Sequence, residues 1–232
     1  PRAGRTAQGR RRLRSVLAVT ALDLFAAHGF EATTVDQIAE AAGVGRRTFF
    51  RYFGSKEDVL FPDHGERMAE VERVLAAAED TEPPLLPVSK AAEVVLDMYL
   101  AEPAVSLRRF ELTRQVPSLR DKEITTIDRY ERIFARYLQQ RYAGERNGPL
   151  RASVSASAVV AAHNHVLREW LKSAGSLDAR AMLINALGLV RSALSESWDE
   201  SAGPEDRVVV SVVRTAASAG EVMRHLQGAL RE

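Results

Sequence analysis

Apolar residues recur every three or four positions along most of this chain, which is the spacing of a buried helical face. The first such stretch runs from about position 11 to position 28. Its expected buried set is Leu13, Val16, Leu17, Thr20, Ala21, Leu24 and Phe25. The pattern predicts further helices at about 56–79, 89–102, 103–115, 117–142, 151–174, 178–199 and 205–229. Apart from the short run Val208–Val210, no stretch alternates as a strand does, so the predicted fold class is all-α.

Prolines and glycines divide these helices. Pro103 and Pro117 suit the first position of a helix, whereas Pro62 predicts a kink or a break within 56–79. Residues 80–87 have the composition of a linker, and residues 144–149 that of a loop. The helix at 117–142 has the apolar set Ile124, Ile127, Tyr130, Ile133, Phe134 and Leu138. The last helix carries a heptad-like stripe of Val212, Ala216, Ala219, Met223, Leu226 and Leu230.

The stretch 33–60 predicts two short helices joined by a glycine turn. Thr33 or Thr34 suits the N-cap of the first helix, whose apolar residues are Val35, Ile38, Ala39 and Ala42. Gly43 supplies the left-handed backbone that a tight corner needs. The second helix runs from about 46 to 53 and opens on two arginines. This order is typical of a DNA-binding helix-turn-helix, but any helical hairpin within a bundle has a similar pattern.

The charge is distributed unevenly. Residues 1–60 hold ten Lys and Arg against six Asp and Glu, and the remaining residues hold twenty-two against twenty-five. A basic segment joined to a mildly acidic one suits a nucleic-acid-binding module carried by a different domain. The first fourteen residues contain six arginines and no acid, which indicates either an arm that contacts DNA phosphates or a flexible solubilising tail.

Several classes of function lack a sequence signal. The chain has no cysteine, so disulfides and thiolate sites are excluded. It has no run of eighteen apolar residues and no apolar segment typical of a secretory signal, so we expect a cytoplasmic protein without a membrane partner. No nucleophile elbow or phosphate loop is present, and His163 and His165 lie on different sides of a helix. We therefore expect no enzyme, cofactor or metal.

One segment resembles a known family. Phe25–Thr34, Ile38–Ala39, Ala42–Val44 and Thr48–Glu57 are similar to the DNA-binding domain of the tetracycline-repressor (TetR) family. The resemblance implies a basic arm at 1–11, a helix-turn-helix domain at 12–60, and a ligand-binding and dimerisation domain at 61–232. It also implies a homodimer that binds a palindromic operator in double-stranded DNA.

The candidate DNA-binding residues lie on or beside the second short helix. Either of its first two arginines suits a bidentate contact to guanine, and cations and hydroxyls suit phosphates. Phe50 departs from the family, which usually has a phosphate-binding tyrosine there, so it offers only apolar contact. Phe49 and Phe53 are assigned to the core. The complete predicted set is Thr34, Arg46, Arg47, Thr48, Phe50, Arg51, Tyr52 and Lys56.

The larger part implies a small-molecule site and a dimer interface. Aromatic and polar residues on apolar helices are candidates for lining an effector pocket, although such residues are often plain core: Tyr99, Phe110, Tyr130, Phe134 and His163. The dimer-interface candidates are Trp170, Met182, Leu187, Trp198 and the final stripe. Arg46–Phe53, Val116–Leu119 and His163–Trp170 further resemble regulators of mycofactocin systems, which implies an acyl-coenzyme A effector.

These observations favour a repressor that a small apolar or acyl-coenzyme A-like effector releases from its operator. Such an effector acts by binding one conformation better than the other. The alternative is an architectural DNA-binding protein that responds to no ligand.

Overall fold

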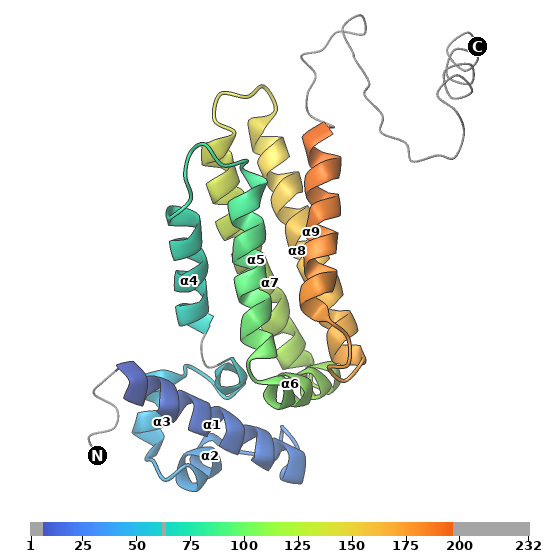
Figure 1. The fold of residues 1–232 in the computed structure, drawn as a ribbon. Coiled ribbons are helices and arrows are strands. Elements are labelled where there is room, and N and C mark those ends of the chain that lie inside the picture. Colours follow the sequence, from blue (N-terminus) through green and yellow to red (C-terminus); the bar gives the residue numbers. More distant parts are fainter. Residues whose placement is uncertain (1–6, 62–63, 197–232) are drawn as a thin grey trace, which may run out of the picture. The chain divides into compact units, whose positions relative to one another are not determined.

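The computed structural model describes residues 7–61 and 64–196, and within these ranges all regular structure is helical (Figure 1). In chain order the elements are α1 Ala7–His28, α2 Val35–Ala41, α3 Arg46–Tyr52, η1 Glu57–Leu60 (a 3-10 turn), α4 His64–Ala76, α5 Leu85–Leu100, α6 Pro103–Gln115, α7 Pro117–Arg141, α8 Gly148–Lys172 and α9 Ala179–Glu196. The all-α prediction is confirmed.

Local signals end and begin the first helices. Gly29 ends α1 with φ +84° and donates its N–H to the Phe25 carbonyl. Thr34, rather than Thr33, caps α2: its Oγ1 accepts from the Gln37 N–H at 3.2 Å, and the Gln37 side chain accepts from the Thr34 N–H at 2.8 Å. This reciprocal capping box satisfies two backbone donors that the helix leaves free. Gly43 turns the chain with φ +70°, as the sequence predicted.

The small core around these helices takes residues from farther along the chain. Leu17, Phe25, Ile38 and Phe49 pack at its centre. Val116 and Leu119, from the start of α7 and the residue before it, belong to the same cluster, and Leu119 is fully buried. The first sixty residues therefore do not close their own core.

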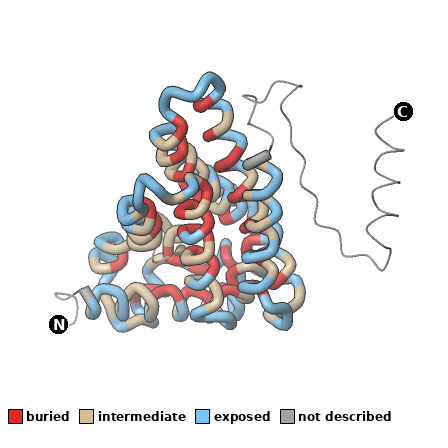
Figure 2. The backbone as a smooth tube through the Cα atoms, turned by 45° about the horizontal axis from the view of Figure 1, so that its top comes forward, coloured by how far each residue is buried: buried red, intermediate tan, exposed pale blue. Residues whose placement is uncertain are grey.

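The larger core lies among α5, α7, α8 and α9 (Figure 1), and the buried positions follow the inward faces of these helices (Figure 2). Its buried residues all come from positions 71–187. The first residue of α8, Gly148, must lack a side chain, because a Cβ there would lie 2.3 Å from the Tyr142 carbonyl oxygen. No helix in the described ranges combines the length and the apolar character needed to cross a membrane.

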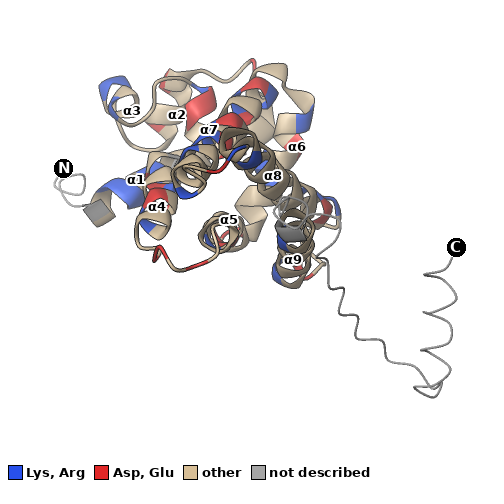
Figure 3. Ribbon diagram, turned by 90° about the horizontal axis from the view of Figure 1, so that it is seen from above, with Lys and Arg blue, Asp and Glu red and all other residues tan. Residues whose placement is uncertain are grey.

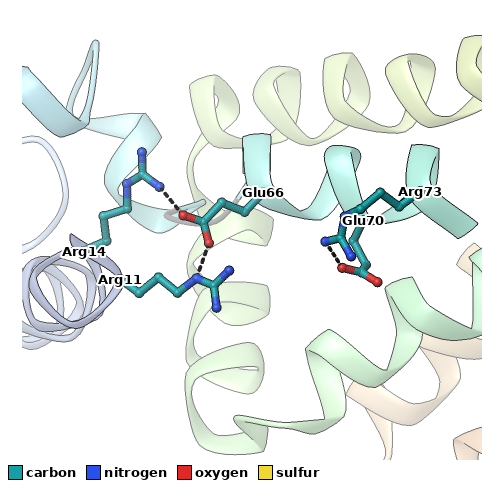
Figure 4. A network of polar contacts seen from close by, with 5 residues as sticks. All are labelled: Arg11, Arg14, Glu66, Glu70 and Arg73. Atoms are coloured by element: carbon teal, nitrogen blue, oxygen red, sulfur yellow. Dashed lines mark hydrogen bonds and ion pairs between the residues drawn. The ribbon is translucent and has the colours of Figure 1, made fainter. Parts of the chain in front are cut away.

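Ion pairs join α4 to α1. Glu66 on α4 accepts from Arg11 at 2.6 Å and from Arg14 at 3.2 Å, both on α1 (Figure 4). Arg73 pairs with Glu70 farther along α4 (Figure 4). At the other end of α1, Asp23 pairs with Arg108 on α6 at 2.6 Å. These exposed pairs contribute little free energy each, but they link the helix-turn-helix region to α4 and α6.

Several predicted boundaries differ from the structure. The stretch 56–79, for which Pro62 predicted a kink or a break, is divided into a 3-10 turn at 57–60 and a separate helix His64–Ala76, which ends three residues early; Pro62 itself lies outside the described residues. Part of the expected linker is helical, because α5 begins at Leu85 and its first turns accommodate Pro87. Residues 7–11, assigned to a basic arm, form the first turn of α1. The loop expected at 144–149 gives way to α8 from Gly148.

Two predicted core positions are wrong. Val16 is 42% exposed and Ile124 is 58% exposed, so each lies at the solvent edge of its helix. Ala18 and Leu22 are buried in α1 instead. The helix predicted at 205–229, with its heptad-like stripe, lies outside the described residues.

Candidate functional site

The exposed face of α3 gathers cations around one apolar ring. Arg46, Arg47, Phe50 and Arg51 are exposed, while Phe49 on the opposite face is fully buried in the small core. The Lys and Arg positions of α3 and α1 are coloured blue on the ribbon in Figure 3. Because α3 buries its other face, the core sets the orientation of the helix, and its cations lie on the surface.

The two leading arginines have different surroundings. Arg46 pairs with Asp36 of α2 at 2.6 Å, and its guanidinium lies 5.3 Å from the centre of the Phe50 ring. Arg47 has no hydrogen-bond or ion-pair partner among the described residues. Its planar fork of donors is thus the more available for a bidentate contact.

Tyr52 lies between two cations. The guanidinium carbons of Arg14 and Arg51 lie 5.8 and 5.2 Å from the centre of its ring. Tyr52 is half-buried, as is Thr48, and Thr34 is exposed at the start of α2. Tyr52 and Thr48 thus belong to α3 and Thr34 to the start of α2, and their contact to DNA stays a prediction.

Lys56 lies in a different environment from the one expected. Its Nζ donates to the Phe30 carbonyl at 2.7 Å and lies 4.2 Å from the centre of the Phe30 ring. It precedes a 3-10 turn rather than a long helix. Its contact to phosphate stays a prediction.

A second candidate site is a cavity inside the larger core. It has a volume of about 40 Å³. Four of the five predicted lining residues, Tyr99, Tyr130, Phe134 and His163, lie around it. The sequence prediction omitted Phe61, Ala92, Val95, Glu123, Thr126, Ile127, Val160, Asn164 and Leu167.

Most of the omitted lining residues lie one or two helical turns from predicted ones. Val95 and Ala92 precede Tyr99 by four and seven positions, and Val160 and Leu167 flank His163. Helical spacing around each predicted residue is the signal that identifies them. Phe61 carries no such signal, because it reaches the cavity from the far end of the helix-turn-helix region.

Burial disfavours the charged forms of the titratable groups around the cavity. Burial lowers the pKa of His163 to about 4, and burial raises the pKa of Tyr130 to about 12. The Nδ1 of His163 lies 3.3 Å from the Asn164 Oδ1, while its Nε2 is buried without a hydrogen-bond partner among the residues that the structure describes. Burial also raises the pKa of Glu123, against the opposing charges of Arg109, Arg168 and Arg120. The cavity is therefore mainly apolar and has a few buried hydrogen-bonding groups, as ligand pockets commonly do.

A basic groove of about 560 Å³ adjoins this cavity. The two share Glu123, Ile127, Asn164 and Leu167. The groove's cations are Arg114, Arg120, Arg168 and Lys172. Phe110, the fifth predicted pocket residue, lines this groove and not the cavity.

Comparison with known proteins gives a consistent result. Residues 17–61 match the family described as bacterial regulatory proteins, tetR family, and residues 82–195 match the MftR C-terminal domain. The transcriptional regulator TcmR of Streptomyces glaucescens is 30% identical over 200 residues, covering 81% of this chain and 87% of TcmR. This chain belongs to the TetR family of transcriptional regulators.

A second regulator is similar in sequence, and two solved structures share the fold. MftR of Mycobacterium tuberculosis, named for mycofactocin biosynthesis, is 29% identical over 153 residues, covering 64% of this chain and 77% of MftR. The structure of the SmeT–triclosan complex has the same fold, with a TM-score of 0.55, 21% identity, and coverage of 78% of this chain and 91% of that one. The fatty acid degradation regulator FadR of Bacillus halodurans also shares it, with a TM-score of 0.54 and 18% identity over 76% of this chain and 93% of that one. The two named relatives of this TetR-family protein are regulators rather than enzymes.

TetR-family regulators act as dimers, and the predicted interface residues need correction. Trp170 and Leu187 are 3% and 0% exposed, because they fill the protomer's own core. Met182 is half-buried against that core, and Trp198 lies outside the described residues. The exposed apolar side chains of α8 and α9 are Leu150, Val154, Ile184 and Leu189. The prediction therefore assigned inward-facing residues of α8 and α9 to a partner subunit.

Proposed function

We propose that this regulator is a homodimeric repressor, which an acyl-coenzyme A-like effector releases from a palindromic operator. In the proposed division, residues 1–11 contact phosphates, residues 12–60 read DNA, and residues 61–232 bind the effector and dimerise. The observation that carries the effector proposal is the apolar cavity joined to a basic groove.

The face of α3 supports operator recognition. Its exposed arginines suit guanine edges and phosphates, and the Phe50 ring, 45% exposed, suits the methyl group of a thymine. Thr34, Thr48, Tyr52 and Lys56 supply hydroxyl and ammonium donors for the flanking phosphates. A dimer would present two such faces to half-sites about 34–36 Å apart or a multiple of it.

The two parts of the effector site suit the two parts of an acyl-coenzyme A. An acyl chain matches the apolar lining around Phe134, Val160 and Leu167. The phosphates of the coenzyme match the groove's arginines, whose planar forks bind phosphate oxygens in pairs. Free coenzyme A or a short acyl chain fills only part of this combined site, so both should bind more weakly.

Exposed apolar residues on α8 and α9 support dimerisation. Ile184 is 54% exposed and Leu189 is 73% exposed, on a helix whose other face is in the core. A second copy would cover such side chains by an isologous contact between equivalent helices.

The experiment is a DNA-binding titration with the full chain, using a duplex that the protein selects from a random-sequence pool. Palmitoyl-coenzyme A should weaken binding by about five- to 150-fold, the usual range of coupling between two sites. Butyryl-coenzyme A and free coenzyme A serve as controls and should act only at much higher concentration. Unchanged DNA affinity with palmitoyl-coenzyme A at saturation would overturn the effector proposal.

A further inference from the structure

A buried cation lies where the effector cavity meets the helix-turn-helix region. Arg109 on α6 is only 7% exposed, although its guanidinium is charged. Its Nη1 donates to the Leu60 carbonyl at 3.2 Å. Leu60 is the last residue of η1 and is itself buried in the small core. A buried charge is costly unless well partnered, so the position of this guanidinium is tightly defined.

The same guanidinium faces two rings of the cavity wall. Its central carbon lies 4.9 Å from the centre of the Tyr99 ring and 5.7 Å from that of Phe61. Both distances are within the range of cation–π attraction. Tyr99 and Phe61 line the cavity, whereas Arg109 does not. One side chain thus connects the cavity wall to a backbone carbonyl of the DNA-binding region without touching the cavity.

The Tyr99 ring is also shared with α4. The guanidinium of Arg67 lies 5.5 Å from its centre. At the start of α6, the Ser106 hydroxyl donates to the Tyr99 carbonyl at 2.9 Å. A displacement of Tyr99 therefore reaches α4 and α6 together, and both helices contact α1 through ion pairs.

The size of the cavity makes such a displacement necessary. A pocket for a small molecule usually has about 300–1,000 Å³, far more than the roughly 40 Å³ present. An effector must therefore push lining side chains outward, and Tyr99 and Phe61 are among them. We infer that Arg109 is the positioning residue that transmits this displacement. When the two rings move, its guanidinium gives up the hydrogen bond to the Leu60 carbonyl. This inference rests on the proposed function, since it explains how occupancy of the cavity reaches the operator-binding face.

The test replaces the effector by a side chain. Ala92 lines the cavity and is 1% exposed, so Ala92→Leu fills the space from within. This change is combined with Arg109→Met, which keeps an unbranched apolar stem but removes the charge and the donors. The control is Arg132→Met, an exposed arginine on α7 that pairs within its own helix, with Asp128. Fluorescence anisotropy then gives the affinity of each full-length variant for the selected duplex, after a thermal melt has established folding.

Ala92→Leu should weaken DNA binding at least about fivefold in the unaltered chain and in Arg132→Met, but less than about twofold in Arg109→Met. An equal loss in all three backgrounds overturns the inference, as does unchanged affinity in the unaltered chain. Val160→Leu and Arg109→Leu provide the same cycle if either first-choice variant does not fold. The cycle uses no effector, so a failure of palmitoyl-coenzyme A to release DNA overturns the effector proposal separately.

Discussion

The small core around Phe49 and the large core around Leu183 differ in the origin of their residues and in where they keep their polar groups. The small core borrows Val116 and Leu119 from beyond α6 and keeps its cations outside, on α3. The buried residues of the large core all come from positions 71–187, and this core encloses His163 beside a cavity. A surface that binds a charged polymer needs exposed cations, whereas a small-molecule site needs groups that water does not reach. Because Val116 and Leu119 lie at the start of α7 or just before it, the position of the DNA-binding face also depends on the larger domain.

The borrowed part of the small core provides the largest expected effect. Leu119→Ala removes a fully buried side chain and should lower the free energy of unfolding by about 4 kcal/mol, from lost burial and the remaining cavity. It should also weaken DNA binding, because Leu119 supports the helices that carry α3. Chemical denaturation and anisotropy with the selected duplex measure the two effects.

The matched control for this variant is Leu183→Ala in the large core, which is equally buried. It should cost a similar free energy of unfolding but leave the DNA affinity of the folded protein nearly unchanged. Equal effects of both variants on DNA affinity would contradict the contrast between the two cores.

The enclosed histidine predicts a pH dependence of stability. The folded protein holds the pKa of His163 at about 4, whereas an unperturbed histidine has 6.5. The unfolded chain therefore binds a proton that the folded chain does not, and stability falls as pH drops from about 6.5 to about 4. The full loss from this group is on the order of 3 kcal/mol.

Urea denaturation across this pH range checks the prediction. His163→Gln should flatten the profile, because glutamine does not titrate. His165→Gln, at an exposed position two residues away, should retain the unaltered protein's slope. Identical profiles for the two variants would mean that His163 is not the group responsible.

The exposed cations of α3 provide the smallest effect. Arg47→Ala should weaken binding to the selected duplex by about tenfold and relax sequence preference, as expected for loss of one base contact. Arg46→Ala should have less influence on preference, since Asp36 already engages that guanidinium. Titrations on the selected duplex and a scrambled one compare the two. A larger loss of preference in Arg46→Ala would reverse the assignment.

Local signals predicted much of this fold. The prolines at 103 and 117 set the starts of α6 and α7 at the predicted residues, and Gly29 and Gly43 end their helices. What local signals do not contain is the identity of the neighbouring element. Val16 and Ile124 fit the helical period but lie at the edges of their buried faces, where solvent rather than another helix meets them. Trp170 and Leu187 were assigned to a partner copy for the same reason, although their own protomer covers them.

The candidate sites show the same limit. Four cavity residues were predicted from aromatic and polar positions on apolar helices, because a cavity inside a bundle is lined by the faces that point inward. The role of Arg109 was not predicted, since its partners at Leu60, Phe61 and Tyr99 meet only in the folded chain.

The pairing of Glu66 with two arginines has a consequence for counterions. Arg11 and Arg14 share this single carboxylate, so together the three side chains present one net positive charge to a DNA phosphate rather than two. The number of cations released from DNA scales with the charge that the protein brings to its phosphates. In the proposed phosphate contact, Arg11 and Arg14 together would therefore add about one unit, not two, to the slope of the logarithm of affinity against the logarithm of salt concentration. Under the proposed function, Glu66 on α4 would thus moderate how steeply DNA binding responds to ionic strength.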